Sequence, residues 1–288
     1  MRSLLKRRGT RKKVQFRHEN MTTTRTFNSW LTYTKPYPQA SVRLFCFPYA
    51  GGSSIIFRTW AESLPTTVEV CSIELPGRGT QMKSAPFSRL KPLVGAITQA
   101  LTRNQFAPAL LPHLNKPFAF FGHSMGAVVS FELARLLRKQ YDLKPVHMFV
   151  SGRRAPQIPD PDPPIHALSE PEFIEELRRL NGTPEALLEN AELMQLLVPI
   201  LRADFEVLET YVYTTEPPLD CPITAFGGLQ DREVNCDELQ AWREQTNAAF
   251  SLQMFRGDHF FLHSAQSLLL QSLSQELQQI TNKIDSRQ

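Results

Sequence analysis

The stretch Phe118-Ala119-Phe120-Phe121-Gly122-His123-Ser124-Met125-Gly126-Ala127 decides how the chain is interpreted. Its apolar start is typical of a buried strand, and helical spacing of apolar residues follows over 125–139. This strand–turn–helix setting makes the Gly-x-Ser-x-Gly pattern between them the signature of a nucleophilic serine. We therefore predict that Ser124 is a nucleophile at a helix N-terminus, where unpaired N–H groups favour developing negative charge. Gly122 and Gly126 are expected to be required because the sharp turn leaves no room for side chains.

The rest of the chain alternates between short apolar runs and segments with helical spacing. The apolar runs are Val42–Phe47, Val68–Leu75, Phe118–Phe121, Val146–Val150, Ile223–Phe226 and Leu252–Phe255. Apolar residues at helical spacing also fill 269–284, with Gln and Ser on the other face. Such alternation predicts an α/β fold with a mainly parallel central sheet flanked by helices.

One segment interrupts this alternation between the runs ending at Val150 and beginning at Ile223. It starts with a linker rich in Pro and Asp, residues 156–164, and continues with leucines on three- and four-residue steps. The spacing predicts a helical insertion at about 169–213. Insertions of this kind at one edge of a sheet commonly serve as lids, although the leucines could also simply bury one another.

A nucleophilic serine needs a base, and His259 fits that role best. It follows the run Leu252–Phe255 through a Gly257-Asp258 turn, which places it at the sheet edge where Ser124 emerges. His263 is the second choice and is expected to belong to the last helix. The other histidines lie in the N-terminal tail, beside the nucleophile or at other elements: His18, His113, His123, His147 and His166.

The base in turn needs an acid, and Asp231 is the best candidate. It follows the run Ile223–Phe226 through residues 227–230, at the equivalent edge one strand earlier. A solvated turn aspartate is the alternative interpretation of Asp231. Asp258 is too close to His259 in sequence, and Asp237 is interpreted as the N-cap of a helix starting at Glu238.

An oxyanion intermediate requires two backbone N–H donors. Met125, directly after the nucleophile, should supply one of them. The other should come from the Gly-rich turn Phe47-Pro48-Tyr49-Ala50-Gly51-Gly52, from Ala50 or a neighbour. A phosphate loop is disfavoured at this turn, because no Gly-x-x-x-x-Gly-Lys-[Ser/Thr] pattern completes it.

Charge and cysteine content bear on partners and location. Residues 1–20 contain eight basic residues and one acidic residue, a net charge of +7, so the remainder carries −3 of the total +4. We expect 1–20 to be a disordered extension and 21–288 to be the catalytic domain, without affinity for nucleic acid or membrane. The cysteines 46, 71, 221 and 236 show no paired spacing, and two of them lie in strand-like runs. Reduced thiols and a cytoplasmic location are predicted.

With these residues placed, the chain resembles the type II thioesterases that accompany nonribosomal peptide and polyketide synthetases. The resemblance spans about Trp30 to Leu273. Six blocks carry it in order: Leu44-Phe45-Cys46-Phe47-Pro48-Tyr49-Ala50-Gly51-Gly52, Leu75-Pro76-Gly77-Arg78-Gly79, Phe121-Gly122-His123-Ser124-Met125-Gly126-Ala127, Ser151-Gly152-Arg153-Arg154-Ala155-Pro156, Leu201-Arg202-Ala203-Asp204-Phe205 and Gly257-Asp258-His259-Phe260-Phe261-Leu262. Medium-chain fatty-acyl carrier-protein thioesterases look similar too.

The resemblance implies an α/β-hydrolase fold with a mobile helical lid. It also implies a catalytic triad of Ser124, Asp231 and His259, with Ala50 and Met125 as oxyanion donors. The implied substrates are acyl or aminoacyl thioesters on the phosphopantetheine arm of carrier proteins. Such an enzyme needs no metal or bound cofactor, and a monomer is expected.

Two further functions compete with this one. A lipase or esterase acting on free esters is disfavoured by the six blocks and by the absence of a His-Gly-Gly-Gly oxyanion motif. A non-catalytic hydrolase-like binding module is disfavoured because candidates for all three triad members are present.

Overall fold

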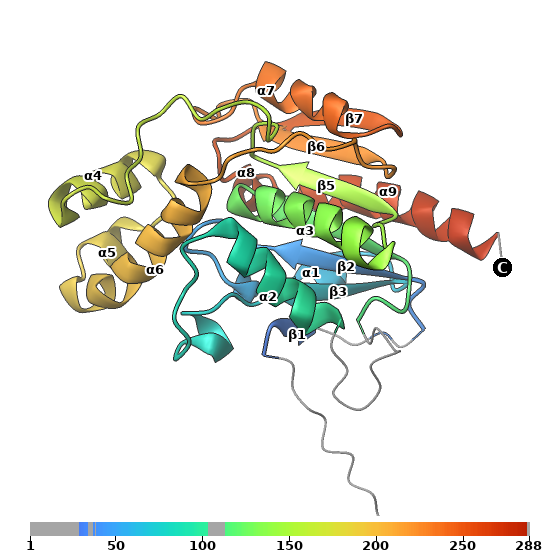
Figure 1. The fold of residues 1–288 in the computed structure, drawn as a ribbon, viewed down its shortest axis with the longest axis horizontal. Helices are drawn as coiled ribbons and strands as arrows, with labels where there is room; N and C mark the ends of the chain where they lie inside the picture. Colours follow the sequence, from blue (N-terminus) through green and yellow to red (C-terminus); the bar gives the residue numbers. More distant parts are fainter. Residues whose placement is uncertain (1–28, 34–36, 38, 103–112, 287–288) are drawn as a thin grey trace, which may run out of the picture.

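A mostly parallel sheet forms the centre of the molecule (Figure 1). The structure, a computed structural model, describes residues 29–33, 37, 39–102 and 113–286. Within these residues the sheet has seven strands in the order β1-β3-β2-β4-β5-β6-β7. The strands are β1 (Leu31–Tyr33), β2 (Val42–Phe47), β3 (Val68–Ile73), β4 (Phe118–His123), β5 (His147–Ser151), β6 (Ile223–Gly228) and β7 (Phe250–Phe255). β1 is antiparallel to β3, and all other pairs are parallel.

The predicted α/β fold is confirmed. Six strands lie where the apolar runs predicted them, with ends that differ by at most two residues. The sequence did not predict β1, because three residues are too few to show a period. Tertiary pairing defines this strand instead: Leu31 lies opposite Ile73 and is buried at the edge of the sheet.

Helices cover both faces of the sheet, and the side chains of β2 show how each face is filled. Phe45 and Phe47 point toward α2 and α3, whereas Leu44 and Cys46 point toward α1 and α9, because successive strand residues alternate between faces. Each large apolar side chain buried in this way stabilises the fold by about 1.5–3 kcal/mol. The helices and 3-10 turns against the sheet are η1 (Ser54–Phe57), α1 (Trp60–Ser63), η2 (Gly79–Gln81), α2 (Leu90–Thr102), α3 (Met125–Tyr141), α7 (Cys236–Gln240), η3 (Ala241–Gln245), α8 (Phe261–Ser264) and α9 (Gln266–Asp285).

Three helices between β5 and β6 form the insertion: α4 (Glu170–Leu180), α5 (Glu185–Leu188) and α6 (Ala191–Glu209). They lie together beside the sheet in Figure 1. A capping box of Ser169 and Glu172 starts α4. Together with Ile165 of the segment before α4, their apolar faces share a core of their own, separate from the two sheet cores: Phe173, Leu177, Leu188, Met194, Val198 and Leu201. We call residues 170–209 the lid helices.

Several sequence expectations concern location. No helix among the described residues combines the length and the apolarity that crossing a bilayer requires. Cys46 and Cys71 are buried in the sheet, as predicted, and Cys221 is buried as well, whereas Cys236 is exposed. The basic segment 1–20 lies outside the described residues.

Candidate active site

Ser124 occupies a strained turn between β4 and α3, which we call the elbow. Its φ of 52° and ψ of −114° lie outside the regions that most residues adopt, and it is the N-cap of α3. A Cβ on Gly122 would lie 2.2 Å from the carbonyl oxygen of Gly126, and a Cβ on Gly126 would lie 2.2 Å from the carbonyl oxygen of Phe47. Both predictions are thus confirmed: the serine begins a helix, and neither glycine position has room for a side chain.

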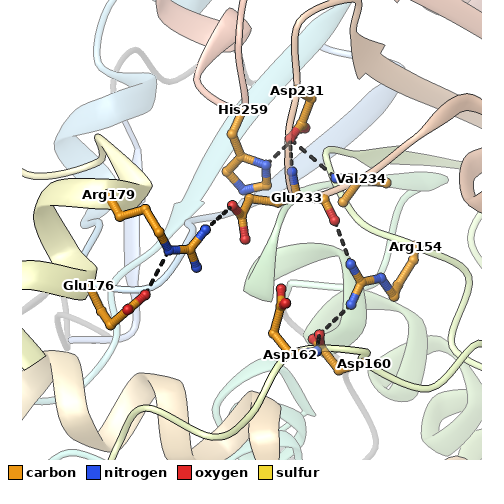
Figure 2. A network of polar contacts seen from close by, with 9 residues as sticks. All are labelled: Arg154, Asp160, Asp162, Glu176, Arg179, Asp231, Glu233, Val234 and His259. Atoms are coloured by element: carbon orange, nitrogen blue, oxygen red, sulfur yellow. Dashed lines mark hydrogen bonds and ion pairs between the residues drawn. The ribbon is translucent and has the colours of Figure 1, made fainter.

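His259 and Asp231 lie together, as the sequence predicted. His259 Nδ1 is 2.9 Å from Asp231 Oδ2, and the Asp231 side chain is completely buried (Figure 2). The other carboxylate oxygen accepts the backbone N–H groups of Glu233 and Val234, at 2.8 and 3.3 Å. These bonds orient the carboxylate toward Nδ1. A neutral ring that donates its Nδ1 proton to Asp231 presents Nε2 as an acceptor, as a general base requires.

Ser124 and His259 line one cavity at the carboxyl edge of the sheet. Tyr49 and Ala50, from the loop after β2, line it from another side. The lid helices and the linker before them contribute an apolar wall: Ile165, Leu177, Leu180, Leu201, Phe205 and Leu208. The structure therefore gathers the predicted nucleophile, base and one oxyanion donor around one cavity, part of whose wall is apolar.

The second predicted oxyanion donor is also beside Ser124. Met125 is the first residue of α3, so its N–H has no acceptor within the helix. Gly126 packs on the carbonyls of Phe47 and Pro48, which brings the start of α3 close to the loop that carries Ala50. The two predicted donors thus come from segments that touch.

Two other histidines near the site have different surroundings. His123 is fully buried, its Nδ1 lies 2.8 Å from Ser151 Oγ, and burial lowers its pKa well below the ordinary value. His263 Nε2 lies 3.0 Å from the Tyr49 hydroxyl. Placing His263 in the last helix was wrong, because it belongs to the short α8 that precedes α9. Neither ring is paired with a carboxylate of the described residues, as His259 is.

The interpretation of Asp237 as an N-cap was also wrong. Asn235 is the N-cap of α7, and its side chain accepts the N–H of Glu238 at 3.0 Å. Asp237 lies in the first turn instead, where a negative charge suits the helix dipole. It takes no part in the site, which leaves Asp231 as the carboxylate that holds His259.

A set of ion pairs that the sequence did not predict borders the lid side of the cavity (Figure 2). Arg179 of α4 bonds to Glu176 and, at 3.0 Å, to Glu233, whose backbone N–H holds Asp231. Arg154 pairs with Asp160 and donates to the backbone carbonyl of Glu233. The two contacts that reach Glu233 join residues 54 and 79 positions apart, so no local spacing reveals them.

Comparisons with known proteins agree with this arrangement. The thioesterase domain family matches residues 42–277. Linear gramicidin dehydrogenase LgrE of Brevibacillus parabrevis is 49% identical over 252 residues, which are 86% of this chain and 92% of that protein. Gramicidin S biosynthesis protein GrsT of Aneurinibacillus migulanus is 46% identical over 250 residues, 87% of this chain and 94% of that protein.

A solved structure supports the same family. RedJ, a thioesterase from the prodiginine biosynthetic pathway of Streptomyces coelicolor, superposes with a TM-score of 0.76 at 37% identity. The match covers 84% of this chain and 87% of that one. The name of LgrE states a redox activity, whereas the family match and RedJ are thioesterases. The family match covers most of the chain and includes the elbow serine and the Asp231–His259 pair, so the chain belongs to the thioesterase domain family.

Proposed function

We propose that this thioesterase hydrolyses acyl or aminoacyl thioesters from the phosphopantetheine arm of synthetase carrier proteins. The observation that carries the proposal is that His259, which Asp231 contacts through Nδ1, lines the same cavity as Ser124. LgrE and GrsT are named for gramicidins and RedJ for prodiginine, which supports a role in secondary-metabolite biosynthesis. The enzyme would clear wrongly primed or stalled acyl groups from its synthetase.

The first half of the reaction transfers the acyl group to Ser124. His259 Nε2 takes the hydroxyl proton as Ser124 Oγ bonds to the thioester carbonyl carbon, and the electrons of the broken C=O π bond move to its oxygen. The N–H groups of Ala50 and Met125 stabilise this oxyanion. Collapse of the intermediate breaks the C–S bond, and the thiolate, with a pKa near ~8.5, leaves with little acid help and takes the proton from His259.

The second half releases the acid. His259 takes a proton from water, whose oxygen bonds to the ester carbonyl carbon. Collapse breaks the bond to Ser124 Oγ, which takes the proton back, and the enzyme returns to its starting state. These steps use side chains and backbone amides alone, so we propose that no metal or bound cofactor takes part. Cys46, Cys221 and Cys236 form no disulfide within the described residues, which supports a reducing, cytoplasmic setting.

The central test is the Ser124→Ala variant. We expect hydrolysis of an acyl-loaded carrier protein to fall by up to about a million-fold, the scale of losing a triad nucleophile. Free thiol release measures the rate, and mass spectrometry of wild type mixed with a fluorophosphonate should locate the label on Ser124. A Ser124→Ala enzyme with near-normal turnover would refute the assignment.

The two neighbouring histidines offer a matched comparison for the base. His259→Gln should lose roughly as much activity as Ser124→Ala, since a serine hydroxyl without its base is a poor nucleophile. His263→Gln removes a ring of the same size, which contacts Tyr49 and is not paired with a carboxylate. It should retain most of the activity, and the reverse order of the two variants would make His263 the base.

The apolar wall of the cavity favours one alternative, a medium-chain fatty-acyl carrier-protein thioesterase. Side chains such as Leu177, Leu201 and Phe205 would bury the methylenes of a fatty chain, at about 0.8 kcal/mol each. Rates on acetyl-, aminoacyl- and decanoyl-carrier substrates decide between the two functions. A steep preference for decanoyl supports the alternative, and faster hydrolysis of a simple aryl ester than of any carrier thioester would indicate an esterase.

A further inference from the structure

A buried ion pair joins the lid helix α6 to the loop after β3. Arg78 Nη1 and Nη2 donate to Asp204 Oδ2 and Oδ1 at 2.6 and 2.8 Å, a bidentate arrangement. The two side chains are only 7% and 4% exposed. Removing two charges from water is unfavourable unless other groups satisfy their remaining hydrogen bonds. The groups that do so here belong to the loop beside the nucleophile.

Both members of the pair hold the backbone of residues 51 and 52. Asp204 Oδ2 accepts the N–H of Gly51 at 2.7 Å, and Arg78 Nη1 donates to the carbonyl of Gly52 at 3.0 Å. Gly51 has a φ of +77°, and a Cβ there would lie 2.5 Å from Leu201 Cδ2 of α6. The helix therefore packs directly on this loop and binds it through charged groups.

The contact bears on the oxyanion donor because Ala50 directly precedes Gly51. Asp204 fixes the peptide unit that joins Ala50 to Gly51. The Ala50 N–H lies in the preceding peptide unit, which shares the Ala50 Cα with this one, so its rotation is restricted as well. A donor aimed before the reaction stabilises developing charge without reorganising during it. The arrangement also depends on the lid, since Asp204 and Leu201 are both residues of α6.

We infer that Arg78 and Asp204 are positioning residues, which aim the Ala50 N–H at the oxyanion when α6 is seated on the loop. This inference rests on the proposed function, and it makes the seating of the lid a condition for a complete oxyanion hole. A pair with a purely structural role would stabilise the fold, but its loss would weaken binding of the transition state no more than binding of the substrate. The two roles therefore differ in what each variant does to kcat.

The Asp204→Asn variant tests the inference, because it keeps the shape and removes the charge. We expect kcat on an acyl-carrier substrate to fall by about 10- to 100-fold, the scale of a misplaced donor and less than the loss of a whole one, with little change in KM. Affinity for an acyl trifluoromethyl ketone should fall by a similar factor. In that adduct Ser124 Oγ bonds to the carbonyl carbon, the oxygen takes the π electrons, and His259 holds the proton. Binding of the free acid product, which has no tetrahedral centre, should stay the same.

The pair Arg43 and Glu69 provides a matched control at the other end of the sheet. Arg43 Nε donates to Glu69 Oε2 at 2.7 Å between the starts of β2 and β3, and the side chains are 12% and 7% exposed. Glu69→Gln should lower the melting temperature and leave kcat and ketone affinity unchanged. Equal losses of kcat in Glu69→Gln and Asp204→Asn would overturn the inference.

Arg78→Lys serves as a second variant, and it decides the matter if Asp204→Asn does not fold. Lysine keeps the positive charge but cannot reproduce the bidentate contact together with the bond to Gly52. It should lower kcat and ketone affinity together by about threefold to tenfold, a fraction of the loss of a whole donor. Unchanged kcat and ketone affinity in a folded variant would refute positioning while leaving the thioesterase proposal intact. A wild type inactive on every carrier thioester would refute the proposed function instead.

Discussion

At the scale of single residues, two glycines in different surroundings should respond in opposite ways to the same added methyl group. The Cβ of Gly122→Ala would meet backbone of the α3 start, which cannot move without shifting Ser124. We expect it to lower the free energy of unfolding by at least about 1–3 kcal/mol, as overpacking does. It should also reduce kcat/KM by about 100-fold, because misplacing a reacting group by about an ångström has that effect.

Gly95 is the matched control. It lies inside α2, and a Cβ there would meet no atom within 4 Å beyond its chain neighbours and the backbone of its own helix. Gly95→Ala should raise the free energy of unfolding by about 0.4–1 kcal/mol, because alanine restricts the unfolded chain and favours the helix. Urea denaturation and initial rates measure both variants. A Gly122→Ala protein as stable and as active as Gly95→Ala would contradict the steric account of the elbow.

Which site residues the sequence predicts depends on how far their partners lie along the chain. Ser124 could be predicted because strand, turn and helix lie within one continuous stretch, and His259 and Asp231 because each follows a strand directly. The Arg78–Asp204 pair could not, since its members are 126 positions apart and neither flanks the nucleophile. Arg78 does lie in the second of the six family blocks, and Asp204 lies in the fifth. Their place in these blocks was the one sign in the sequence that the two residues have a role in the family.

At the scale of elements, the lid helices should loosen without the sheet. Phe173 of α4 is fully buried, packs edge-on against Phe205 of α6 with centroids 5.9 Å apart, and lies under Arg202. Phe173→Ala removes about 3–5 kcal/mol of packing. Because the lid core is separate from the sheet cores, we expect amide exchange in α4 and α6 to accelerate by about 100-fold or more, with β4 and β5 unchanged.

Leu196 supplies the control for this prediction. It lies on the same helix α6 but is 65% exposed, so Leu196→Ala removes little packing. Hydrogen exchange followed by mass spectrometry should show nearly wild-type rates in the lid of that variant. Equal acceleration of the lid and of β4 in Phe173→Ala would mean that lid and sheet unfold as one unit.

Periodicity predicted the elements in proportion to their length and burial. The central strand β4 is buried along its whole length, and β2 is buried except at Arg43, so both begin or continue as nearly unbroken apolar runs and their positions could be read directly. β7 is an edge strand with an alternating pattern of exposure, and its first two residues escaped prediction. The long helices α3 and α9 were expected. The short α7 was expected from its capping residues, with its start placed two residues late at Glu238, whereas α8 was taken as part of the last helix because no period separates the two.

At the scale of the whole molecule, buried histidines should make the protein sensitive to acid. Among the described residues, burial lowers the pKa of four histidines: His113, His123, His147 and His263. A folded protein that holds histidines neutral binds fewer protons than its unfolded chain. Below the ordinary pKa of 6.5 the unfolded state is therefore favoured as the pH falls.

His147 allows this effect to be measured. Burial, and to a lesser extent the charge of Lys283, lowers its pKa from 6.5 to about 4, and its Nε2 lies 2.8 Å from Thr224 Oγ1. Its neutral form contributes stability that is fully present above pH 6.5 and is lost as the pH falls toward 4. Between pH 7 and pH 5 this one group should lower the free energy of unfolding by about 2 kcal/mol.

The His147→Gln variant isolates that contribution, because glutamine can still bond to Thr224 but has no proton to gain. Its loss of stability between pH 7 and pH 5, measured by urea denaturation at each pH, should be about 2 kcal/mol smaller than the loss in wild type. The remaining loss belongs to His123 and the other buried rings, so the variant should still be less stable at pH 5. An identical loss in variant and wild type would mean that His147 is already solvated in the folded protein, contrary to its burial at the start of β5.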